Sequence, residues 1–577
     1  MSTGDRSVAG DAGNSMAGQF SVRPTLPALL EHASQPKPRS RASFLQMAVV
    51  LLAGCAHAIS IAWPFSLGLI QGQPVWWLQM LAMAVLALYL DNCRTWKRGA
   101  FLGWLFATAL QCATWWWLFI SLHTYGGLAS PLAVIAIVGL AAFLALYYAA
   151  VCGVFVAIAP AHRAQRALVF AALWLLAELG RVEFFTGFPW GEGGYAHLDG
   201  PFANLVKLVG VHGLTFGAAL AAAAVAGLLL RPRLFNAGVV MAGLLIAAIL
   251  SFVLRIAPDA ASSFTSAYPV PASGNKPFTV TLLQGNIPQD EKFQGGKGIP
   301  DALNWYGNQL LAATSSLVVT PETAIPLLPA HLPPNYLDTL FARFVKPPAG
   351  APATAALIGI PLGNSQVGYS NSAIALKPQT VESPDLAAGV YRYNKHHLVP
   401  FGEFVHPLFK WFLAIVDIPL ADFNSGAVRQ PSFDWQGQRL APNICYEDLF
   451  GEELAARFRD PASSPTIFVN ISNIAWFGNT IAIDQHLNIS RMRALEFERP
   501  MLRATNTGAT AVIDYTGQVT HLLPRHTRGA LVAEVAGRSG TTPYAWWASR
   551  LGLWPWWALI VLVLAVTLAL RPGRRKA

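Results

Sequence analysis

Leu440-Ala441-Pro442-Asn443-Ile444-Cys445-Tyr446-Glu447-Asp448 is the stretch that decides the fold of this chain. Its first five residues predict a short buried strand, and the chain turns polar directly after Cys445. This cysteine is the only thiol in the hydrophilic half of the sequence; the others lie in or beside apolar segments, at Cys55, Cys93, Cys112 and Cys152. A lone cysteine is more often a small buried hydrophobe than a nucleophile. The surrounding motifs decide between these two interpretations.

Composition divides the chain into a membrane part and a polar part. Of its 577 residues, 54% are hydrophobic and only 12% are charged, about half the charged fraction of an average soluble domain. Segments long enough to cross a bilayer as helices occur at 45–62, 74–90, 99–120, 131–159, 167–185, 204–229, 236–254 and 551–570. We therefore expect a seven-helix transmembrane domain at 43–257 and a final membrane helix at 551–570. Residues 1–42 are polar and predict a disordered cytoplasmic tail, not a signal peptide.

Basic residues predict the orientation of these spans. They cluster in alternate connections, at Arg39 and Arg41, at Arg94, Lys97 and Arg98, at Arg163 and Arg166, at Arg231 and Arg233, and at Arg571, Arg574, Arg575 and Lys576. Such clusters mark cytoplasmic loops, so the domain at 276–540, which follows seven spans, is expected outside, in a bacterial periplasm. The net charge of +10 comes with no nucleic-acid-binding motif, and no nucleic-acid partner is expected.

The domain at 276–540 has the pattern of a layered α/β protein. Strands are predicted at 277–284, 316–320, 354–361, 371–377, 439–445, 466–472, 510–515 and 530–536, and helices at 300–314 and 482–497. Some strands alternate with helices and others form hairpin pairs. This mixture favours a layered sandwich over a purely parallel sheet.

Two residues of this domain are candidates to act with Cys445. Glu322 follows the apolar strand 316–320, where partial desolvation is expected to raise its pKa and suit it to general-base work. Lys395 lies in a charged and aromatic run, where it would lower the pKa of a neighbouring thiol and stabilise an oxyanion. Glu403 is a possible ion-pair partner or second carboxylate. Taken singly, each of these charges also fits an ordinary surface position.

Other catalytic or metal-binding arrangements are less well supported by the sequence than Glu322, Lys395 and Cys445. His396 and His397 suggest a Cys–His dyad, but no third residue stands in a recognisable context to orient the imidazole. No His or Cys pair has the spacing of a zinc site, so neither a metal nor a cofactor is expected. Glu178 and Arg181, three residues apart in a predicted span, either pair with each other or contact substrate, and pairing is preferred.

Several blocks resemble known families. Pro321-Glu322, the run from Tyr393-Asn394-Lys395 to Glu403, and Ile444-Cys445-Tyr446-Glu447 resemble the catalytic blocks of the nitrilase superfamily, in the same order. The layout and two further blocks, Ala475-Trp476-Phe477-Gly478 and Arg491–Glu496, resemble the apolipoprotein N-acyltransferase family over residues 45–570. The chain departs from that family at Ile474, where Asp is usual, and at Phe293, where Trp is common.

The resemblance implies an architecture and a reaction. It implies a membrane bundle of about eight helices with a nitrilase-like αββα sandwich on the periplasmic side of the bacterial inner membrane. Glu322 would take the proton of Cys445, the thiolate would attack the sn-1 ester of a phospholipid, and Lys395 would hold the oxyanion. The resulting thioester would pass its acyl chain to the N-terminal amine of a diacylglyceryl-modified apolipoprotein.

The resemblance also implies supporting residues. Glu403, Tyr446 and Glu447 would support the site, and Trp476 would lie on a mobile loop at its entrance. A monomer is the default for such a self-contained bundle.

Two other functions stay open at this point. A membrane-tethered amidase would use the same three residues with water as the acceptor. Apolar residues around the middle block favour a lipid donor, although they also fit ordinary packing: Phe401, Phe404, Leu408, Phe409, Trp411 and Phe412. A receptor or transporter is disfavoured because the seven spans show no internal repeat.

Overall fold

The structure is a computed structural model that describes residues 41–230, 234–257, 276–348, 350–378, 390–405 and 422–570. Most of the predicted tail, the basic residues at 231–233 and 571–576, and the apolar residues Leu408, Phe409, Trp411 and Phe412 lie outside the described residues.

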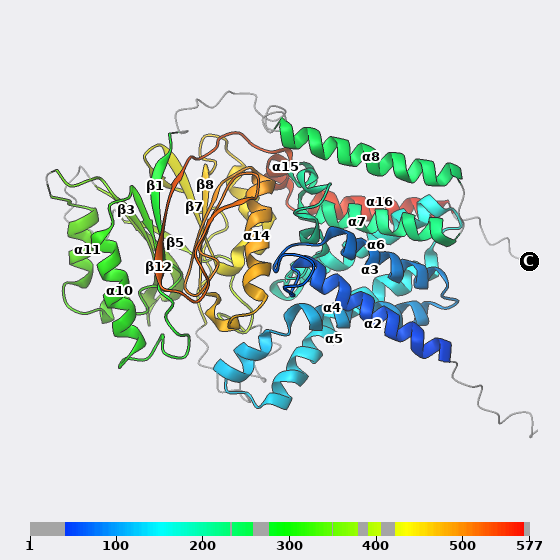
Figure 1. Ribbon diagram of the computed structural model, residues 1–577, viewed down its shortest axis with the longest axis horizontal. Helices are drawn as coiled ribbons and strands as arrows, with labels where there is room; N and C mark the ends of the chain where they lie inside the picture. Colours follow the sequence, from blue (N-terminus) through cyan, green and yellow to red (C-terminus); the bar gives the residue numbers. More distant parts are fainter. Residues whose placement is uncertain are drawn as a thin grey trace, which may run out of the picture. The chain divides into compact units, whose positions relative to one another are not determined.

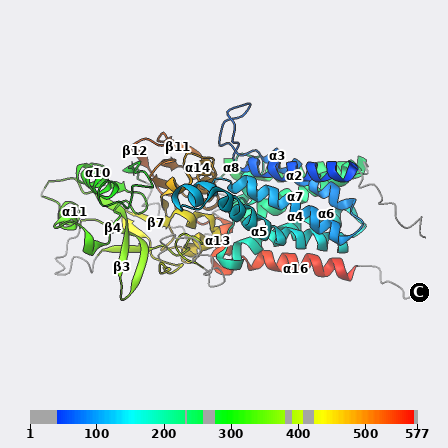
Figure 2. The same ribbon diagram turned by 90° about the horizontal axis from the view of Figure 1, so that it is seen from below.

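Helices occupy all eight predicted spans. In chain order they are α2 (Arg41–Ile61), α3 (Trp76–Asp91), α4 (Trp96–Trp115), α5 (Ser130–Ile158), α6 (Arg163–Glu183), α7 (Val206–Leu230), α8 (Leu234–Ile256) and α16 (Trp554–Ala569). Helix α16 returns from the far end of the sequence and packs on α6 (Figure 2).

Fewer of these helices qualify as spans by length and apolarity. Among the described residues, four do so, at Ser43–Ile61, Ser130–Ile158, Ala203–Leu230 and Asn236–Ile256. A fifth qualifies if α15 (Pro543–Leu551) and α16, which meet at an angle of 86°, form one bent span. Helix α3 is short, with 16 residues, and α6 carries charged residues at both ends. A membrane helical region is therefore supported, and the number of eight spans stays a prediction.

The second half of the chain folds into two six-stranded sheets. The first has the order β12-β1-β2-β3-β4-β5 and the second β11-β10-β9-β8-β7-β6. Their bounds are β1 Phe278–Gln284, β2 Leu317–Val319, β3 Ala355–Asn364, β4 Gly368–Leu376, β5 Tyr391–Asn394, β6 Phe433–Trp435, β7 Gln438–Ile444, β8 Ile467–Ser472, β9 Met501–Thr505, β10 Ala511–Ile513, β11 Val519–Leu522 and β12 Gly529–Val535.

The two sheets form the inner layers of a sandwich. Apolar side chains from both sheets, such as Leu282 and Val319 on one and Leu440 and Val469 on the other, make a single buried cluster. Helices α10 (Gly298–Ala312) and α11 (Tyr336–Phe344) cover the outer face of the first sheet, and α14 (Ala482–Phe497) lies on the second (Figure 1). The predicted αββα layering is confirmed.

The directions of the strands bring several strand ends together. Strands β1, β2 and β3 are parallel neighbours in one sheet, and β7, β8 and β9 are parallel neighbours in the other. Their carboxyl ends gather at one edge of each sheet, which is where α/β proteins place ligands. Strand β5 runs in the same direction as β3, because β4 is antiparallel to both.

The core of the helical half extends to this edge. Buried bundle residues such as Phe106 and Trp174 belong to the same apolar cluster as Tyr446, Leu449 and Phe450, which follow β7. The segment that follows β7 is therefore packed directly on the helices.

Candidate active site

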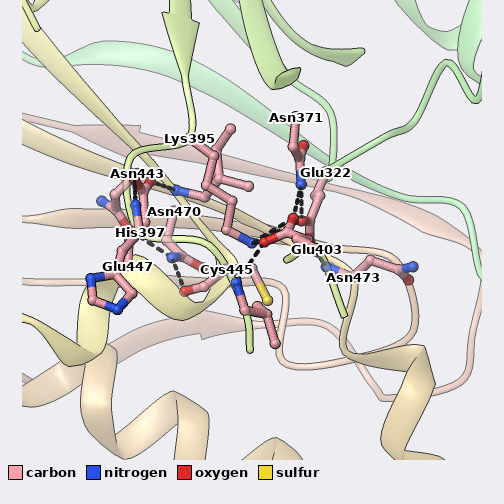
Figure 3. Close-up of polar contacts among 12 residues, drawn as sticks. Glu322, Asn371, Lys395, His397, Glu403, Asn443, Cys445, Glu447, Asn470 and Asn473 are labelled. Carbon is pink, nitrogen blue, oxygen red and sulfur yellow. Dashed lines mark hydrogen bonds and ion pairs between the residues drawn. The ribbon is translucent and has the colours of Figure 1, made fainter. Parts of the chain in front are cut away.

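Three predicted residues meet at the carboxyl ends of their strands. Glu322 follows β2, Lys395 follows β5 and Cys445 follows β7. Figure 3 shows their side chains together, with Glu403 beside them. The sheet topology thus assembles residues that are 50 or more positions apart in the sequence.

Cys445 sits on a sharp elbow. It is the first residue of a 3-10 turn, Cys445–Leu449, and has a φ of +54°. A non-glycine residue in the left-handed region costs about 1–2 kcal/mol, so surrounding contacts must hold it there. Two side chains do so, since Asn470 Nδ2 and His486 Nε2 each lie 3.2 Å from the Cys445 carbonyl oxygen. The half-buried thiol is thereby presented beyond the strand end.

Lys395 is an ammonium shared by two carboxylates. Its side chain is 1% exposed, and Nζ lies 3.5 Å from Glu322 Oε1 and 2.9 Å from Glu403 Oε2. Burial lowers the pKa of Lys395, but the charges of Glu403 and Glu322 outweigh burial and raise it above its usual value. Lys395 therefore stays protonated throughout the physiological range.

Glu322 is held as a carboxylate. Oε1 accepts a hydrogen bond from Asn371 Nδ2 at 2.7 Å, and Oε2 accepts one from the backbone N–H of Asn473 at 2.8 Å. Burial raises its pKa, yet Lys395 and these hydrogen bonds bring the pKa below its usual value. The sequence-based expectation of a raised pKa is wrong, because it took account of burial without these partners.

The thiol itself is protonated at rest. Burial and the charge of Glu322 raise the pKa of Cys445 to about 12, and Lys395 lowers it only in part. Lys395 thus acts on the thiol in the expected direction, but burial and the charge of Glu322 outweigh it. A thiol in this state needs a base before it can act as a nucleophile, and Glu322 is an ionised carboxylate in the same cluster.

Glu403 and Asn371 complete the acid cluster. Asn371 on β4 donates through Nδ2 to Oε1 of both Glu322 and Glu403, at 2.7 Å and 2.6 Å. Glu403 Oε2 also accepts from the backbone N–H of Val399 at 2.9 Å. The predicted second carboxylate lies in the site, whereas Asn371 was missed because nothing in its local sequence marks it.

The histidine dyad is wrong. His397 Nδ1 lies 2.9 Å from Glu453 Oε1, and its Nε2 lies 2.7 Å from the Thr186 carbonyl oxygen. His396 Nδ1 lies 2.6 Å from the carbonyl oxygen of Gly426. Both nitrogens of His397 are thus occupied, and His396 Nε2 faces Glu453 Oε1 at 3.8 Å. These partners hold both imidazoles in the loop that carries Lys395.

Comparison with known proteins now assigns the family. Residues 44–224 match the family model of the apolipoprotein N-acyltransferase N-terminal domain, and residues 279–544 match that of carbon-nitrogen hydrolase. An apolipoprotein N-acyltransferase from Verminephrobacter eiseniae (strain EF01-2) is 54% identical over 522 residues, which cover 88% of this chain and 93% of that protein. The chain belongs to the apolipoprotein N-acyltransferase family.

A second apolipoprotein N-acyltransferase agrees with this assignment. An apolipoprotein N-acyltransferase from Ralstonia nicotianae (strain ATCC BAA-1114 / GMI1000) is 43% identical, covering 86% of this chain and 90% of that protein. Among solved structures, a mutant of Nesterenkonia AN1 amidase from the nitrilase superfamily is 17% identical, with a TM-score of 0.31, and covers 46% of this chain and 93% of that one. The predicted family is confirmed, and the chain is a bacterial membrane protein.

In this member of the acyltransferase family, Glu447 ties the elbow to the lysine loop. Its Oε2 accepts from the backbone N–H of Ile444 at 2.5 Å, and its Oε1 accepts from that of His396 at 2.6 Å. Tyr393 donates its hydroxyl to the same carboxylate at 2.8 Å. Glu447 thus fixes the positions of Cys445 and Lys395 relative to each other.

Tyr446 and Trp476 contact the helical half. The Tyr446 hydroxyl donates to the carbonyl oxygen of Gly187 at 3.0 Å. The Trp476 side chain is 41% exposed, its ring lies edge-on to Tyr125, and its carbonyl oxygen accepts from Ser121 Oγ at 2.7 Å. Both predicted supporting residues therefore lie where the loops of the two halves meet.

The loop contacted by Tyr446 is held by the predicted intramembrane ion pair. Arg181 Nη1 lies 3.6 Å from Glu178 Oε2, with both side chains 1% exposed, which confirms that the two residues pair. Arg181 Nη2 also donates to the carbonyl oxygens of Phe188 and Trp190, at 2.9 Å and 2.7 Å. The charge of α6 thereby fixes the loop beside the nucleophile.

A buried polar network under the elbow was missed by sequence reasoning. Arg503 Nη2 lies 2.9 Å from His486 Nδ1, so Nδ1 accepts and Nε2 carries the proton that reaches Cys445 O and Asp448 Oδ1. Ser490 Oγ donates to Asp448 Oδ2 at 2.5 Å. These residues come from α14, β9 and the elbow itself, and they lock the carbonyl of Cys445.

Ile474 and Phe293 are the two positions at which the chain departs from its family. Ile474 is fully buried and packs with Ile483 and Ala509, so an apolar cluster occupies the position where the family usually has Asp. Phe293 is exposed and lies next to Lys292, a buried lysine that sequence reasoning also missed.

Proposed function

We propose that this chain transfers an acyl chain from a phospholipid, through a thioester on Cys445, to the N-terminal amine of the diacylglyceryl-cysteine of apolipoproteins. The observation that carries the proposal is a half-buried thiol beside an ionised Glu322 that is itself held by Lys395. Membership of the apolipoprotein N-acyltransferase family supplies the class of reaction.

The first half-reaction forms the acyl-enzyme. Glu322 takes the proton of Cys445 as the sulfur attacks the sn-1 ester carbonyl. Lys395 and the backbone N–H groups at the start of the 3-10 turn, which lack intrahelical partners, stabilise the oxyanion. Collapse of the tetrahedral intermediate breaks the ester C–O bond, and Glu322 returns the proton to the departing lysophospholipid oxygen.

The second half-reaction regenerates the thiol. The α-amine of the diacylglyceryl-cysteine attacks the thioester carbonyl, and Glu322 accepts a proton from the attacking nitrogen. The C–S bond then breaks, leaving an amide, and the sulfur regains its proton. A thioester suits this step because amines attack it readily, while a site that faces lipid keeps competing water scarce.

The placement of the site fits lipid substrates. The nucleophile segment shares an apolar core with the helices, and both substrates are anchored in the membrane. We propose a multi-pass protein of the inner membrane, active as a monomer, with its catalytic domain in the periplasm. The alternating basic clusters support this orientation.

Transfer to a lipopeptide tests the proposal against hydrolysis. The full-length protein would be incubated with a diacyl phosphatidylethanolamine and a synthetic diacylglyceryl lipopeptide, and the products measured by mass spectrometry. We expect N-acylated lipopeptide from the wild type and none from a folded Cys445→Ala variant. Release of free fatty acid without N-acylated peptide would instead support the amidase alternative.

A further inference from the structure

A second lysine lies in the active site without a role in the reaction described above. Lys292, in the segment between β1 and α10, is 2% exposed. Its Nζ donates to the backbone carbonyl oxygen of Glu322 at 3.2 Å. Lysine is almost never fully buried unless it is paired, so this position requires an explanation.

The charges of the neighbouring groups explain why a lysine is buried at position 292. Lys395 is shared by two carboxylates, Glu322 and Glu403, and these three groups alone sum to −1. Any step that creates a thiolate or an oxyanion at Cys445 would add a further negative charge in a buried place, which is costly. A second ammonium makes the resting site neutral and keeps it neutral when the proton passes to Glu322 and an oxyanion forms.

We propose that Lys292 is a positioning residue that fixes the backbone of Glu322 and whose charge keeps Glu322 ionised and stabilises negative charge forming at Cys445. The inference rests on the proposed function, in which Glu322 is the base and Cys445 the nucleophile. Lys292 acts through these two residues and needs no contact with substrate.

The electrostatics of Lys292 give this role a pH signature. Burial lowers the pKa of Lys292 to about 8, although the charge of Glu322 opposes this shift. Its charge is therefore lost in mildly alkaline solution, where Lys395 is still protonated. The other charged groups around the pair are Lys395 and Glu403 beyond Glu322, and Asp290, Glu291 and Lys297 on its own segment.

The test measures the rate of acyl-enzyme formation against pH. Full-length protein in mixed micelles with a diacyl phosphatidylethanolamine would be sampled in single turnover from pH 5 to 10, and the hydroxylamine-labile adduct measured by intact-protein mass spectrometry. The variants are Lys292→Met and Lys292→Arg. Lys297→Met is the matched control, since Lys297 lies on the same segment and its side chain is 67% exposed.

Each variant has a defined expectation. Lys292→Met should lower the maximal rate about tenfold or more, the scale at which lost charge stabilisation acts. The acid limb of its pH–rate profile, where the rate rises as Glu322 ionises, should move to higher pH, because removing a cation raises the pKa of Glu322. Lys292→Arg should keep the acid limb and lose the alkaline limb near pH 8, because arginine stays protonated. Lys297→Met should match the wild type.

The outcomes separate this inference from the proposed function. A folded Lys292→Met variant with a lower rate and an unmoved acid limb would show a merely structural lysine and overturn the inference. If Lys292→Met does not fold, an alkaline limb that persists in Lys292→Arg would overturn it equally. A wild type that forms no adduct contradicts the proposed function, whereas an adduct whose pH dependence ignores Lys292 contradicts only this inference.

Discussion

At the scale of single residues, the candidate site keeps a protonated thiol, the proposed nucleophile, next to an ionised carboxylate, the proposed base. The pKa of Cys445 is raised and that of Glu322 is lowered, so the proton moves only when a substrate carbonyl can receive the sulfur. A buried thiol with this protonation state resists adventitious oxidation, which proceeds through thiolates. That property suits a thiol in the oxidising compartment proposed above.

Asn371 is expected to set the acid limb of activity. It donates to Glu322 Oε1 and lowers the pKa of Glu322, and the base works only when ionised. Asn371→Ala should therefore raise that pKa and move the acid limb of acyl-enzyme formation to higher pH, as measured by single-turnover rates. Asn364→Ala, at the exposed end of β3, should leave the acid limb in place; an unmoved limb in Asn371→Ala would contradict this role.

Sequence patterns singled out the candidate catalytic residues and missed the groups around them for a physical reason. Glu322, Lys395 and Cys445 stand in distinctive blocks after strands, so their residue types and local context indicate chemistry. Asn371 and Lys292 are ordinary in their local sequence. Their roles arise only when β4 and the segment after β1 are brought to the same sheet edge.

At the scale of elements, α14 links the helical half to the nucleophile. Its sequence mixes polar and apolar residues, yet nearly all of them are buried. Gln485 Oε1 accepts from the indole N–H groups of Trp117 and Trp190, at 3.1 Å and 2.9 Å, while His486 reaches the carbonyl of Cys445. Adjacent residues of one helix thus contact both the segments that follow α4 and α6 and the elbow.

Replacement of Gln485 tests this link. Gln485→Leu would leave two buried indole N–H groups without an acceptor, each costing about 1–3 kcal/mol, so the free energy of unfolding should fall by about 2–6 kcal/mol. Chemical unfolding in detergent, followed by tryptophan fluorescence, measures the change. Arg491→Gln on the same helix is the control, because its partly exposed pair with Asp199 is worth at most about 1 kcal/mol. Equal losses in both variants would refute a special role for Gln485.

Strands were predicted from runs of apolar residues, so the strands that were missed are those without such runs. The apolar strands, such as β2, β7 and β8, were predicted within a few residues. Strands β5 (Tyr391–Asn394) and β9 (Met501–Thr505) were missed because they are short and carry Arg392 or Arg503. Strands β6 and β11 have only three and four residues. Pairing with neighbours, and not local propensity, makes them strands.

At the scale of the whole molecule, buried charge pairs join sequence-distant segments. Lys207 on α7 lies 2.7 Å from Glu498 after α14, with both side chains 2% exposed. Removing one member of such a pair leaves a buried uncompensated charge and costs about 3–5 kcal/mol.

The pair can be tested with a double-mutant cycle. Lys207→Met alone should lower the free energy of unfolding by about 3–5 kcal/mol. Lys207→Met combined with Glu498→Leu should recover part of that loss, because no unpaired charge remains. Unfolding in detergent measures all variants, and strictly additive losses would show that the two residues are not coupled.

The central claim is that the acyl chain resides on Cys445 between the two half-reactions. Its most direct test is peptide mapping of the protein after incubation with phospholipid and without acceptor, with tandem mass spectrometry used to locate the acyl group. The account predicts one hydroxylamine-labile acyl group, on Cys445, which disappears when lipopeptide is added. An acyl group on another residue, or N-acylation by a folded Cys445→Ala variant, would contradict it.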